Sequence, residues 1–335
     1  MQSDFLKTGC RSFCIDFQNT QRKVMGINSV RPRFTVISPV YNEEQVVPLF
    51  FERLLPVIGK LSENYRVEVL FLNNASTDGT FDAIAKLRNE HPFTYIVTLS
   101  ANVGYQRSLE CGLRHAKGDL MVFIDVDCED PPEMILRFIE HYERGYDIVY
   151  GQRVDREENT IIKSLRKLFY HLIKRVADED SLLYMAEFAL ITSEVRDAMV
   201  RDRSTFPFIR SSIARVGFNR IGIPYKRQKR IAGKTHYDLI GMTIFAIAGI
   251  LSASTLVLRL PIYLFPFWLV VTGILGAIQI ETGNPWMLLA NVLLGCAYIG
   301  GAIAFSALYL ARTYKNGLGR PNYVVHRRYT YFQPE

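Results

Sequence analysis

Short apolar runs alternate with segments of helical spacing through the first half of the chain. Four of these runs end in polar residues, as buried strands do: 34–40, 67–72, 94–100 and 120–124. Three intervening segments carry apolar residues at helical spacing: 43–60, 80–89 and 106–116. A regular alternation of strands and helices predicts an α/β fold with a doubly wound, mostly parallel sheet.

Two later stretches, 260–280 and 286–311, contain no charged residue. Each is long enough to cross a hydrocarbon core about 30 Å thick as a helix. Two buried core helices are the alternative, but uncharged stretches of this length are rare in soluble folds. The loop 281–285 has no Lys or Arg, whereas basic residues flank the outer ends: Arg259, Arg312, Lys315 and Arg320. The positive-inside rule predicts an integral protein of the inner cell membrane, with both outer ends and the α/β domain in the cytoplasm.

The overall composition hides this division. Hydrophobic residues make up 49% of the chain and charged residues 22%, which is ordinary because an apolar hairpin and a charged domain are averaged. The formal net charge of +7 is too small for a nucleic-acid-binding face, so we expect no nucleic-acid partner. It suits a protein that rests on an anionic membrane. The 5 Cys lack metal-ligand spacing and do not indicate a disulfide scaffold.

Polar clusters follow three of the expected strands, at 41–43, 73–74 and 125–127. Ligands of doubly wound sheets bind beyond the carboxyl ends of the strands, so these clusters mark a candidate site. Asp125 and Asp127 lie on one side of an extended segment, and with Glu129 they offer the oxygen ligands that Mg²⁺ or Mn²⁺ prefers. A solvated acidic turn is the alternative, which the position directly after an apolar strand disfavours. The sequence contains no Gly-rich dinucleotide motif and no P-loop.

Six segments then follow one another along the chain: SPVYNE at 38–43, STDGT at 76–80, IDVDCEDPPE at 124–133, GYDIVYGQR at 145–153, RIAGKTHY at 230–237 and RPNYVV at 320–325. Together with the two uncharged stretches, they resemble family 2 glycosyltransferases of the GT-A fold that act on polyprenyl phosphates. Dolichol-phosphate mannose synthases and bacterial undecaprenyl-phosphate glycosyltransferases with a terminal membrane hairpin belong to this group. The resemblance covers residues 34–325.

The resemblance implies roles for individual residues. Those expected to bind the nucleotide sugar are Pro39, Tyr41, Glu43, Leu72, Asn74, Asp125, Val126, Arg153, Arg230 and His236. The expected ligands of Mg²⁺ or Mn²⁺ are Asp125, Asp127 and Glu129. The expected catalytic residues are Asp127, Glu187 and Arg230. Arg210 and Arg227 are candidates to bind the acceptor phosphate, because a guanidinium can hold two phosphate oxygens at once.

The sequence departs from the family pattern at four places. Asn73 and Asn74 stand where the family has two Asp residues, and Glu129 replaces the usual Gln. His236 replaces a Lys, and AEFA at 186–189 replaces Gly-Asp-Phe-Arg, which keeps a carboxylate one carbon longer but loses the Arg. Because the amides remove an acidic contact that a guanine edge favours, we expect a UDP-hexose donor, with GDP-mannose as the alternative.

We expect a metal-dependent, inverting transfer of a hexose from a nucleotide sugar to a polyprenyl phosphate at the cytoplasmic membrane face. The alternative is a non-catalytic, membrane-anchored protein on a diverged glycosyltransferase fold, which the departures suggest. The expected segments are a mobile extension (1–32), a GT-A catalytic domain (33–237), a juxtamembrane amphipathic helix (238–259), a transmembrane hairpin (260–311) and a cytoplasmic tail (312–335). A basic amphipathic segment at 163–176 predicts an interfacial helix, and the hairpin also offers a contact for a homo-oligomer.

Overall fold

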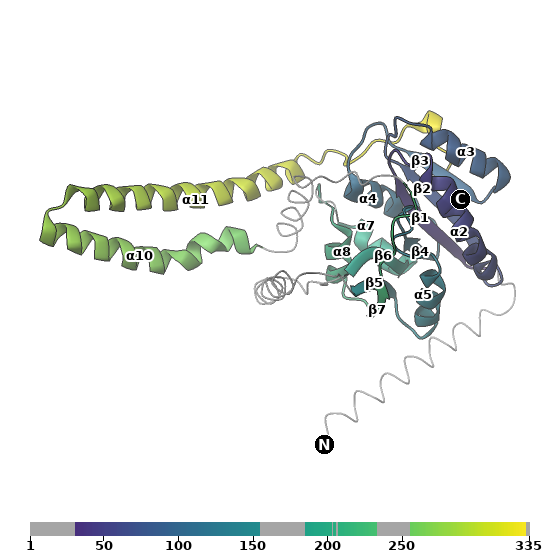
Figure 1. Cartoon of the computed structure of the whole chain (residues 1–335), viewed down its shortest axis with the longest axis horizontal. Helices are drawn as coiled ribbons and strands as arrows, with labels where there is room; N and C mark the ends of the chain where they lie inside the picture. The colour runs from purple at the N-terminus through teal and green to yellow at the C-terminus, as the bar shows by residue number, and fades with distance from the viewer. Residues whose placement is uncertain (1–30, 155–184, 203, 206, 233–254, 333–335) are drawn as a thin grey trace, which may run out of the picture.

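The computed structural model of the chain describes residues 31–154, 185–202, 204–205, 207–232 and 255–332. These residues form an α/β domain from which a long pair of helices projects (Figure 1). Several expected features lie outside the described residues: the extension before residue 31, the helix at 163–176, most of the juxtamembrane helix, and His236.

Within the described residues, seven strands form one sheet in the order β3-β2-β1-β4-β6-β5-β7. The strands are β1 (Arg33–Val40), β2 (Arg66–Asn73), β3 (Thr94–Thr98), β4 (Leu120–Phe123), β5 (Ile148–Val154), β6 (Met185–Thr192) and β7 (Arg220–Lys226). Strands β3, β2, β1 and β4 run parallel, as do β5 and β7, whereas β6 is antiparallel to both β4 and β5. The mostly parallel sheet expected from the sequence is therefore confirmed.

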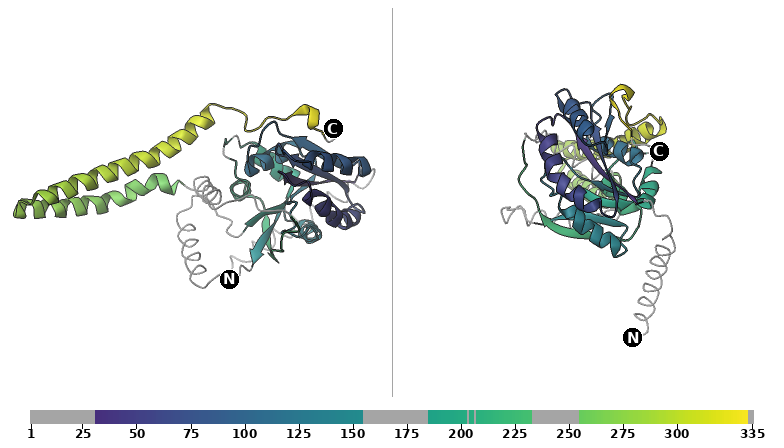
Figure 2. Two further views of the ribbon diagram at one scale, coloured as in Figure 1. Left: turned by 45° about the horizontal axis from the view of Figure 1, so that its top comes forward. Right: turned by 90° about the vertical axis from the view of Figure 1, so that its right-hand side faces the viewer.

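Helices cover both faces of this sheet (Figure 2). They are α2 (Val46–Leu61), α3 (Thr80–Glu90), α4 (Tyr105–His115), α5 (Met134–Glu143), α7 (Ser193–Val200) and α8 (Ile209–Arg215). Side chains of α2, α3 and α5 pack in one hydrophobic core, and those of α4, α7 and α8 pack in a second core. Along β1, Val36 points into the first core and Ile37 into the second. Burial on both faces explains why the parallel strands are continuous apolar runs.

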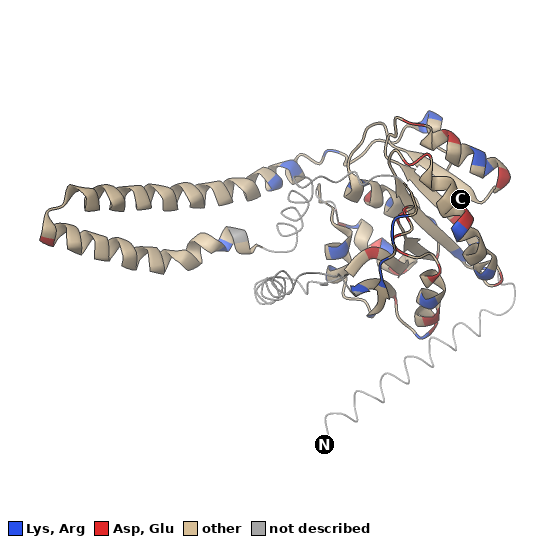
Figure 3. Cartoon of the chain, viewed as in Figure 1, with Lys and Arg blue, Asp and Glu red and all other residues tan. Residues whose placement is uncertain are grey.

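The two uncharged stretches form the helices α10 (Leu256–Thr282) and α11 (Pro285–Gly317). Both are long and apolar enough to cross a membrane. Figure 3 shows charged residues gathered on the α/β domain and near the ends of the pair. Between the helices, Gly283 adopts a positive φ of 64°, and Asn284 caps α11 by accepting a hydrogen bond from the Trp286 N–H at 3.0 Å. Helix α11 continues beyond residue 311, the end expected from the sequence.

The two long helices are joined by hydrogen bonds and stacked rings as well as apolar contact. The Tyr298 hydroxyl donates to the Pro261 carbonyl at 2.7 Å, and its ring stacks on Trp268 with centroids 4.8 Å apart. Farther along the pair, the Asn291 amide donates to the Thr272 carbonyl at 3.2 Å. In a membrane, where water does not compete, such contacts help to hold paired helices together.

The segment after α11 returns to the domain and runs along the edge strand β3. Ile96 and Tyr331 exchange two backbone hydrogen bonds, of 3.1 and 2.7 Å, and the Ser100 N–H donates to the Val324 carbonyl at 2.9 Å. The Tyr331 ring stacks on Phe81 of α3. The part of the expected tail from Asn322 to Tyr331 thus packs against the domain, and it covers an edge of the sheet that would otherwise present free N–H and C=O groups.

Candidate active site

The sheet order brings the three polar clusters of the sequence to one edge. Strands β2, β1 and β4 are neighbours and parallel, so the turns that follow them lie side by side. The turn after β1 is braced against the turn after β2. Asn42 N–H donates to Ser76 Oγ at 3.0 Å, and Glu43 N–H donates to Thr80 Oγ1 at 2.8 Å. Half-buried Tyr41 lies in this braced turn, where the resemblance places the nucleotide.

The acidic motif after β4 turns sharply so that its carboxylates face the site. Val126 and Cys128 are buried in the core, and Asp125 and Asp127 alternate with them on the other side of the chain. Cys128 adopts a positive φ of 58°, a strained conformation for a residue other than Gly. The Glu129 N–H donates to Asp127 Oδ1 at 3.0 Å, which closes the turn. The backbone therefore fixes the spacing of the two carboxylates.

Burial and mutual repulsion disturb both carboxylates. Burial raises the pKa of Asp125 to about 7, and the negative charges of Asp127 and Asp130 add to this effect. Burial also raises the pKa of Asp127, against the opposing charges of Arg230, Arg227 and Arg153. A divalent cation between the carboxylates would remove this repulsion, so the pair fits the expected Mg²⁺ or Mn²⁺.

The third expected metal ligand is engaged elsewhere. Glu129 forms an ion pair with Arg227, one of the two arginines expected to bind the acceptor phosphate. Across the part of the chain that the structure describes, no three Asp, Glu, His or Cys side chains converge closely enough to hold a metal by themselves. Asp125 and Asp127 would therefore share a cation with oxygens of a bound substrate, which is how Mg²⁺ is commonly held beside phosphates.

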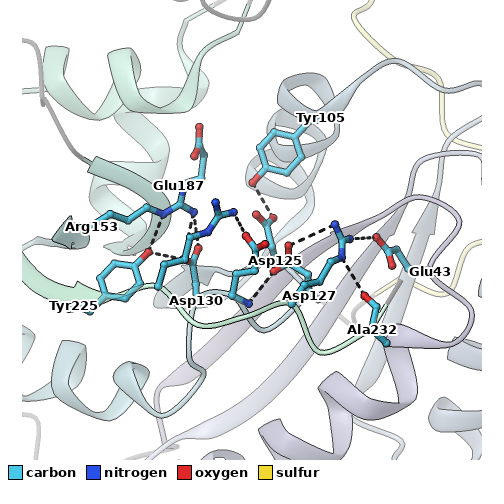
Figure 4. Close-up of polar contacts among 12 residues, drawn as sticks. Glu43, Tyr105, Asp125, Asp127, Asp130, Arg153, Glu187, Tyr225 and Ala232 are labelled. Carbon is cyan, nitrogen blue, oxygen red and sulfur yellow. Dashed lines mark hydrogen bonds and ion pairs between the residues drawn. The ribbon is translucent and has the colours of Figure 1, made fainter. Parts of the chain in front are cut away.

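Arg230 links the acidic motif to the turn after β1, and Figure 4 labels its two acidic partners, Glu43 and Asp127. Its guanidinium donates to Glu43 Oε1 at 2.5 Å and lies 3.9 Å from Asp127 Oδ2. Two backbone hydrogen bonds hold its segment across the motif, from Gln228 N–H to the Glu129 carbonyl at 2.9 Å and from Ile231 N–H to the Asp127 carbonyl at 3.0 Å. Arg230 thus supplies a positive charge beside the candidate metal position.

Arg153 lies in a separate buried group. Its guanidinium donates to Asp130 Oδ2 at 3.0 Å and to the Tyr225 hydroxyl at 3.1 Å, and Tyr225 also donates to Asp130. Burial alone would lower the pKa of Arg153, but the adjacent charge of Asp130 raises it overall. This ion pair makes Arg153 a support for the part of the acidic motif that carries Asp130, and its expected contact with a phosphate stays a prediction.

Glu187 and Arg210 come together at the neighbouring strand β6. Glu187 lies on β6, next to β4, and forms an ion pair with Arg210 at the start of α8. Gln106 donates to Glu187 Oε1 at 3.3 Å and accepts from the Ile209 N–H at 3.1 Å. The structure therefore unites an expected catalytic residue with one expected acceptor arginine, and places the other, Arg227, at Glu129.

Three expected nucleotide contacts are core residues in the structure. Leu72 has no exposed surface and packs in the second core, Val126 packs in the first core, and Pro39 is buried in β1. The side chains of Leu72 and Val126 therefore do not line the surface of the site. Beside Val126, the alternation of the chain directs the partly exposed Asp125 and Asp127 toward the site instead.

Asn74 has a structural role that explains one departure from the family pattern. Its Oδ1 accepts from the Val103 N–H at 3.0 Å, and its Nδ2 donates to Asn102 Oδ1 at 2.9 Å. A carboxylate at this position has no proton to donate to Asn102 when ionised. The neighbouring Asn73 accepts from the Ser76 N–H at 3.0 Å. The amide pair thus organises the surrounding loops.

Sequence reasoning missed four side chains of this site: Tyr105, Gln106, Asp130 and Tyr225. Tyr105 donates a hydrogen bond from its hydroxyl to Asp125 Oδ1 at 2.8 Å. The sequence predicted a helix over 106–116, but helical spacing does not say which side chains of a first turn reach a neighbouring strand. The acidic residue at 130 was visible within the motif, and its burial was not.

Known proteins are similar to this chain in sequence. Residues 35–215 match the family described as glycosyl transferase family 2. The uncharacterized glycosyltransferase YkcC of Bacillus subtilis (strain 168) is 31% identical over 307 residues, which cover 89% of this chain and 94% of that protein. The bactoprenol glucosyl transferase of Shigella phage SfX is 29% identical over 311 residues, 88% of this chain and 99% of that protein.

Among solved structures, the mannosyltransferase PcManGT from Pyrobaculum calidifontis, in complex with GDP-Man and Mn²⁺, is 22% identical and has a TM-score of 0.41. The alignment covers 90% of this chain and 94% of that chain. The family match spans more than half of the chain and includes the acidic motif and Glu187. This protein therefore belongs to glycosyl transferase family 2 and is a glycosyltransferase.

Proposed function

We propose that the protein transfers a hexose from a nucleotide sugar to a polyprenyl phosphate at the cytoplasmic face of the inner cell membrane. The observation that carries this proposal is the juxtaposition of Asp125, Asp127 and Arg230 at the carboxyl edge of the sheet, in a chain with two helices able to cross a membrane. Such a site offers oxygen ligands to a metal and a positive charge to a diphosphate. Two membrane-spanning helices would hold the site close to a lipid acceptor.

The donor side of the proposal rests on the turns after β1, β2 and β4. Asp125 and Asp127 would hold Mg²⁺ or Mn²⁺, and the metal would supply positive charge to offset the charge that develops on the leaving nucleotide. Arg230 adds a second positive charge beside it. We favour a UDP-hexose because the turn after β2 carries amides at Asn73 and Asn74, and because several relatives are named bactoprenol glucosyl transferase.

The acceptor side rests on Glu187, Arg210 and Arg227 and on the names of the relatives. A phosphate oxygen of the lipid attacks the anomeric carbon, a new carbon–oxygen bond forms, and the bond to the nucleotide diphosphate breaks on the opposite side. Attack in line with the leaving group inverts the anomeric centre. Because the lipid phosphate is already anionic near neutral pH, the reaction needs no strong general base.

One observation that suggested a non-catalytic protein, the pair of amides at 73–74, has a structural explanation. The amides at 73–74 suggested a decayed site, but the hydrogen bonds of Asn74 to Val103 and Asn102 give an amide a positive structural reason. The carboxylate pair and Arg230 remain in place beside it.

The test is a transfer assay with membranes that contain the full chain. Radiolabelled UDP-glucose, UDP-N-acetylglucosamine and GDP-mannose are each offered with a polyprenyl phosphate and Mn²⁺, and the lipid product is identified by mass. We expect one UDP-hexose to give a polyprenyl-phosphate hexose, with a loss on the order of 100-fold or more in Asp127→Ala. Full activity of Asp127→Ala, or no lipid-linked product from any donor, would contradict the proposal.

A further inference from the structure

The first turn of α4 lies between the donor and acceptor halves of the site. Helix α4 begins at Tyr105, after a loop in which Gly104 adopts a positive φ of 85°. Asn102 Oδ1 accepts from the Gly104 N–H at 3.0 Å and also from the Asn74 amide at 2.9 Å. Asn74 in turn accepts from the Val103 N–H. The start of α4 is thus fixed by a side chain at the end of β2.

Two consecutive residues of this turn contact two different carboxylates. The Tyr105 hydroxyl donates to Asp125 Oδ1 at 2.8 Å, whereas Gln106 donates to Glu187 Oε1 at 3.3 Å. Successive residues of a helix point about 100° apart, so neighbours in sequence reach targets on different strands. Asp125 follows β4 and Glu187 lies on β6, and these strands are adjacent in the sheet. Figure 4 shows Tyr105 directed at Asp125.

Each contact removes freedom from a side chain whose placement matters for the proposed reaction. Asp125 is repelled by Asp127, and the hydrogen bond from the Tyr105 hydroxyl opposes rotation of the Asp125 carboxylate away from its partner. Both polar atoms of the Gln106 amide are engaged, because its oxygen also accepts from the Ile209 N–H at the start of α8. Gln106 therefore ties Glu187 to the helix that carries Arg210.

We propose that Tyr105 and Gln106 are positioning residues, Tyr105 for the metal-binding Asp125 and Gln106 for the acceptor-side Glu187, and that Asn74 sets both by holding the start of α4. This inference rests on the proposed function for its assignment of the two sides. It goes beyond it because Tyr105 and Gln106 act through two carboxylates and need not touch the donor, the acceptor or the metal. Their effects should be separable, since the two hydrogen bonds end on different carboxylates.

The experiment uses the full-length protein purified in detergent and three variants, Tyr105→Phe, Gln106→Met and Asn74→Asp. Tyr146→Phe, on the loop after α5, is the matched control for loss of a tyrosine hydroxyl. Two quantities are measured: the dissociation constant for Mn²⁺ without any substrate, and the KM for the polyprenyl phosphate. Thermal unfolding of each variant shows whether it is folded.

We expect Tyr105→Phe to weaken Mn²⁺ binding by roughly 3- to 10-fold, as the loss of one hydrogen bond predicts, and to leave the acceptor KM within about twofold. Gln106→Met should raise the acceptor KM by a similar factor and leave Mn²⁺ binding unchanged. Asn74→Asp should impair both quantities, and Tyr146→Phe neither. If Asn74→Asp does not fold, the separation between Tyr105→Phe and Gln106→Met still decides the matter.

The inference is overturned if Tyr105→Phe binds Mn²⁺ as tightly as the unaltered protein, or if Tyr105→Phe and Gln106→Met change both quantities alike. It is also overturned if the unaltered protein binds no Mn²⁺. The Mn²⁺ measurement needs neither donor nor acceptor. A failure of lipid glycosylation would therefore refute the proposed function without deciding the role of Tyr105.

Discussion

Asn316, in the last turn of the second long helix, accepts a hydrogen bond from the backbone N–H of Thr205 in the α/β domain at 3.0 Å. The Thr205 hydroxyl donates to the same oxygen at 2.5 Å. Beyond the end of this helix, the Asn322 amide donates to Glu110 at 2.7 Å and to the Ser204 carbonyl at 2.9 Å. Helix α11 is therefore fastened to the domain at its end, so the orientation of the membrane hairpin relative to the active site is fixed by side-chain contacts.

Replacement of Asn316 should loosen this junction. In Asn316→Ala, the buried Thr205 loses the acceptor of both its N–H and its hydroxyl, which costs about 1–3 kcal/mol of folding free energy. We expect a lower thermal unfolding temperature in detergent and faster amide hydrogen exchange at 204–205. Asn89→Ala, on the exposed face of α3, is the control and should change neither. Equal exchange in the two variants would mean that Asn316 does not hold the junction.

Glu129 offers a sharp test of how the metal is held. Because its carboxylate pairs with the half-exposed Arg227, Glu129→Gln should reduce transfer by about fivefold at most, the cost of a partly exposed ion pair. Asp125→Asn removes a ligand and should reduce transfer on the order of 100-fold. Initial rates at saturating Mn²⁺ compare the two. A loss in Glu129→Gln as large as in Asp125→Asn would make Glu129 a ligand after all.

Binding of Mn²⁺ should depend on pH near neutrality. In the metal-free protein, burial raises the pKa of Asp125 to about 7, and a metal binds only the deprotonated carboxylate. The dissociation constant for Mn²⁺ should therefore fall as pH rises from 6 to 7 and level off above pH 8. Titrations followed by Mn²⁺ electron paramagnetic resonance measure this directly. A dissociation constant that is flat between pH 6 and 8 would contradict it.

The same carboxyl group of Asp125 makes the stability of the metal-free protein depend on pH. A folded-state pKa above the unfolded value means that the folded chain binds the extra proton, so stability from Asp125 is present at low pH and declines as pH rises from about 4 to 7. Asp125→Asn should flatten that part of the stability profile. Denaturant unfolding in the presence of a chelator, at pH 5 and pH 8, gives the difference for both proteins.

The strand-like tail should be needed for a stable sheet edge. Tyr331→Pro removes the N–H that donates to the Ile96 carbonyl at 2.7 Å, and we expect a lower unfolding temperature together with increased light scattering on heating. Arg327→Ala, in the short turn before it, is the control. Should Tyr331→Pro unfold and scatter light as the unaltered protein does, the pairing with β3 contributes nothing to stability.

Features governed by local pattern could be predicted from the sequence. The apolar runs gave the parallel strands because both faces of each are buried, and the absence of charge gave α10 and α11. The order of the polar clusters located the site, since parallel strands end at the same edge.

Contacts between distant segments could not be predicted in this way. Thr98 bonds to Thr330, 232 positions away, and no periodicity encodes that pairing. The partners of Glu129 and Arg153 were also missed, because a buried charge pairs with whichever opposite charge the fold brings near it. The hydrogen bonds of Tyr105 and Gln106 depend on the angle at which α4 begins, which the loop held by Asn74 determines.

The pairing of the tail with β3 also has a consequence for biosynthesis. The strand Thr94–Thr98 leaves the ribosome early, whereas the segment that covers its open edge follows both long helices in the chain. During translation, one edge of the sheet therefore stays unpaired until both long helices and the segment that follows them have been synthesised. Until that segment has been made, the edge of β3 can pair with other chains, so the last residues of the chain complete the sheet that its first half begins.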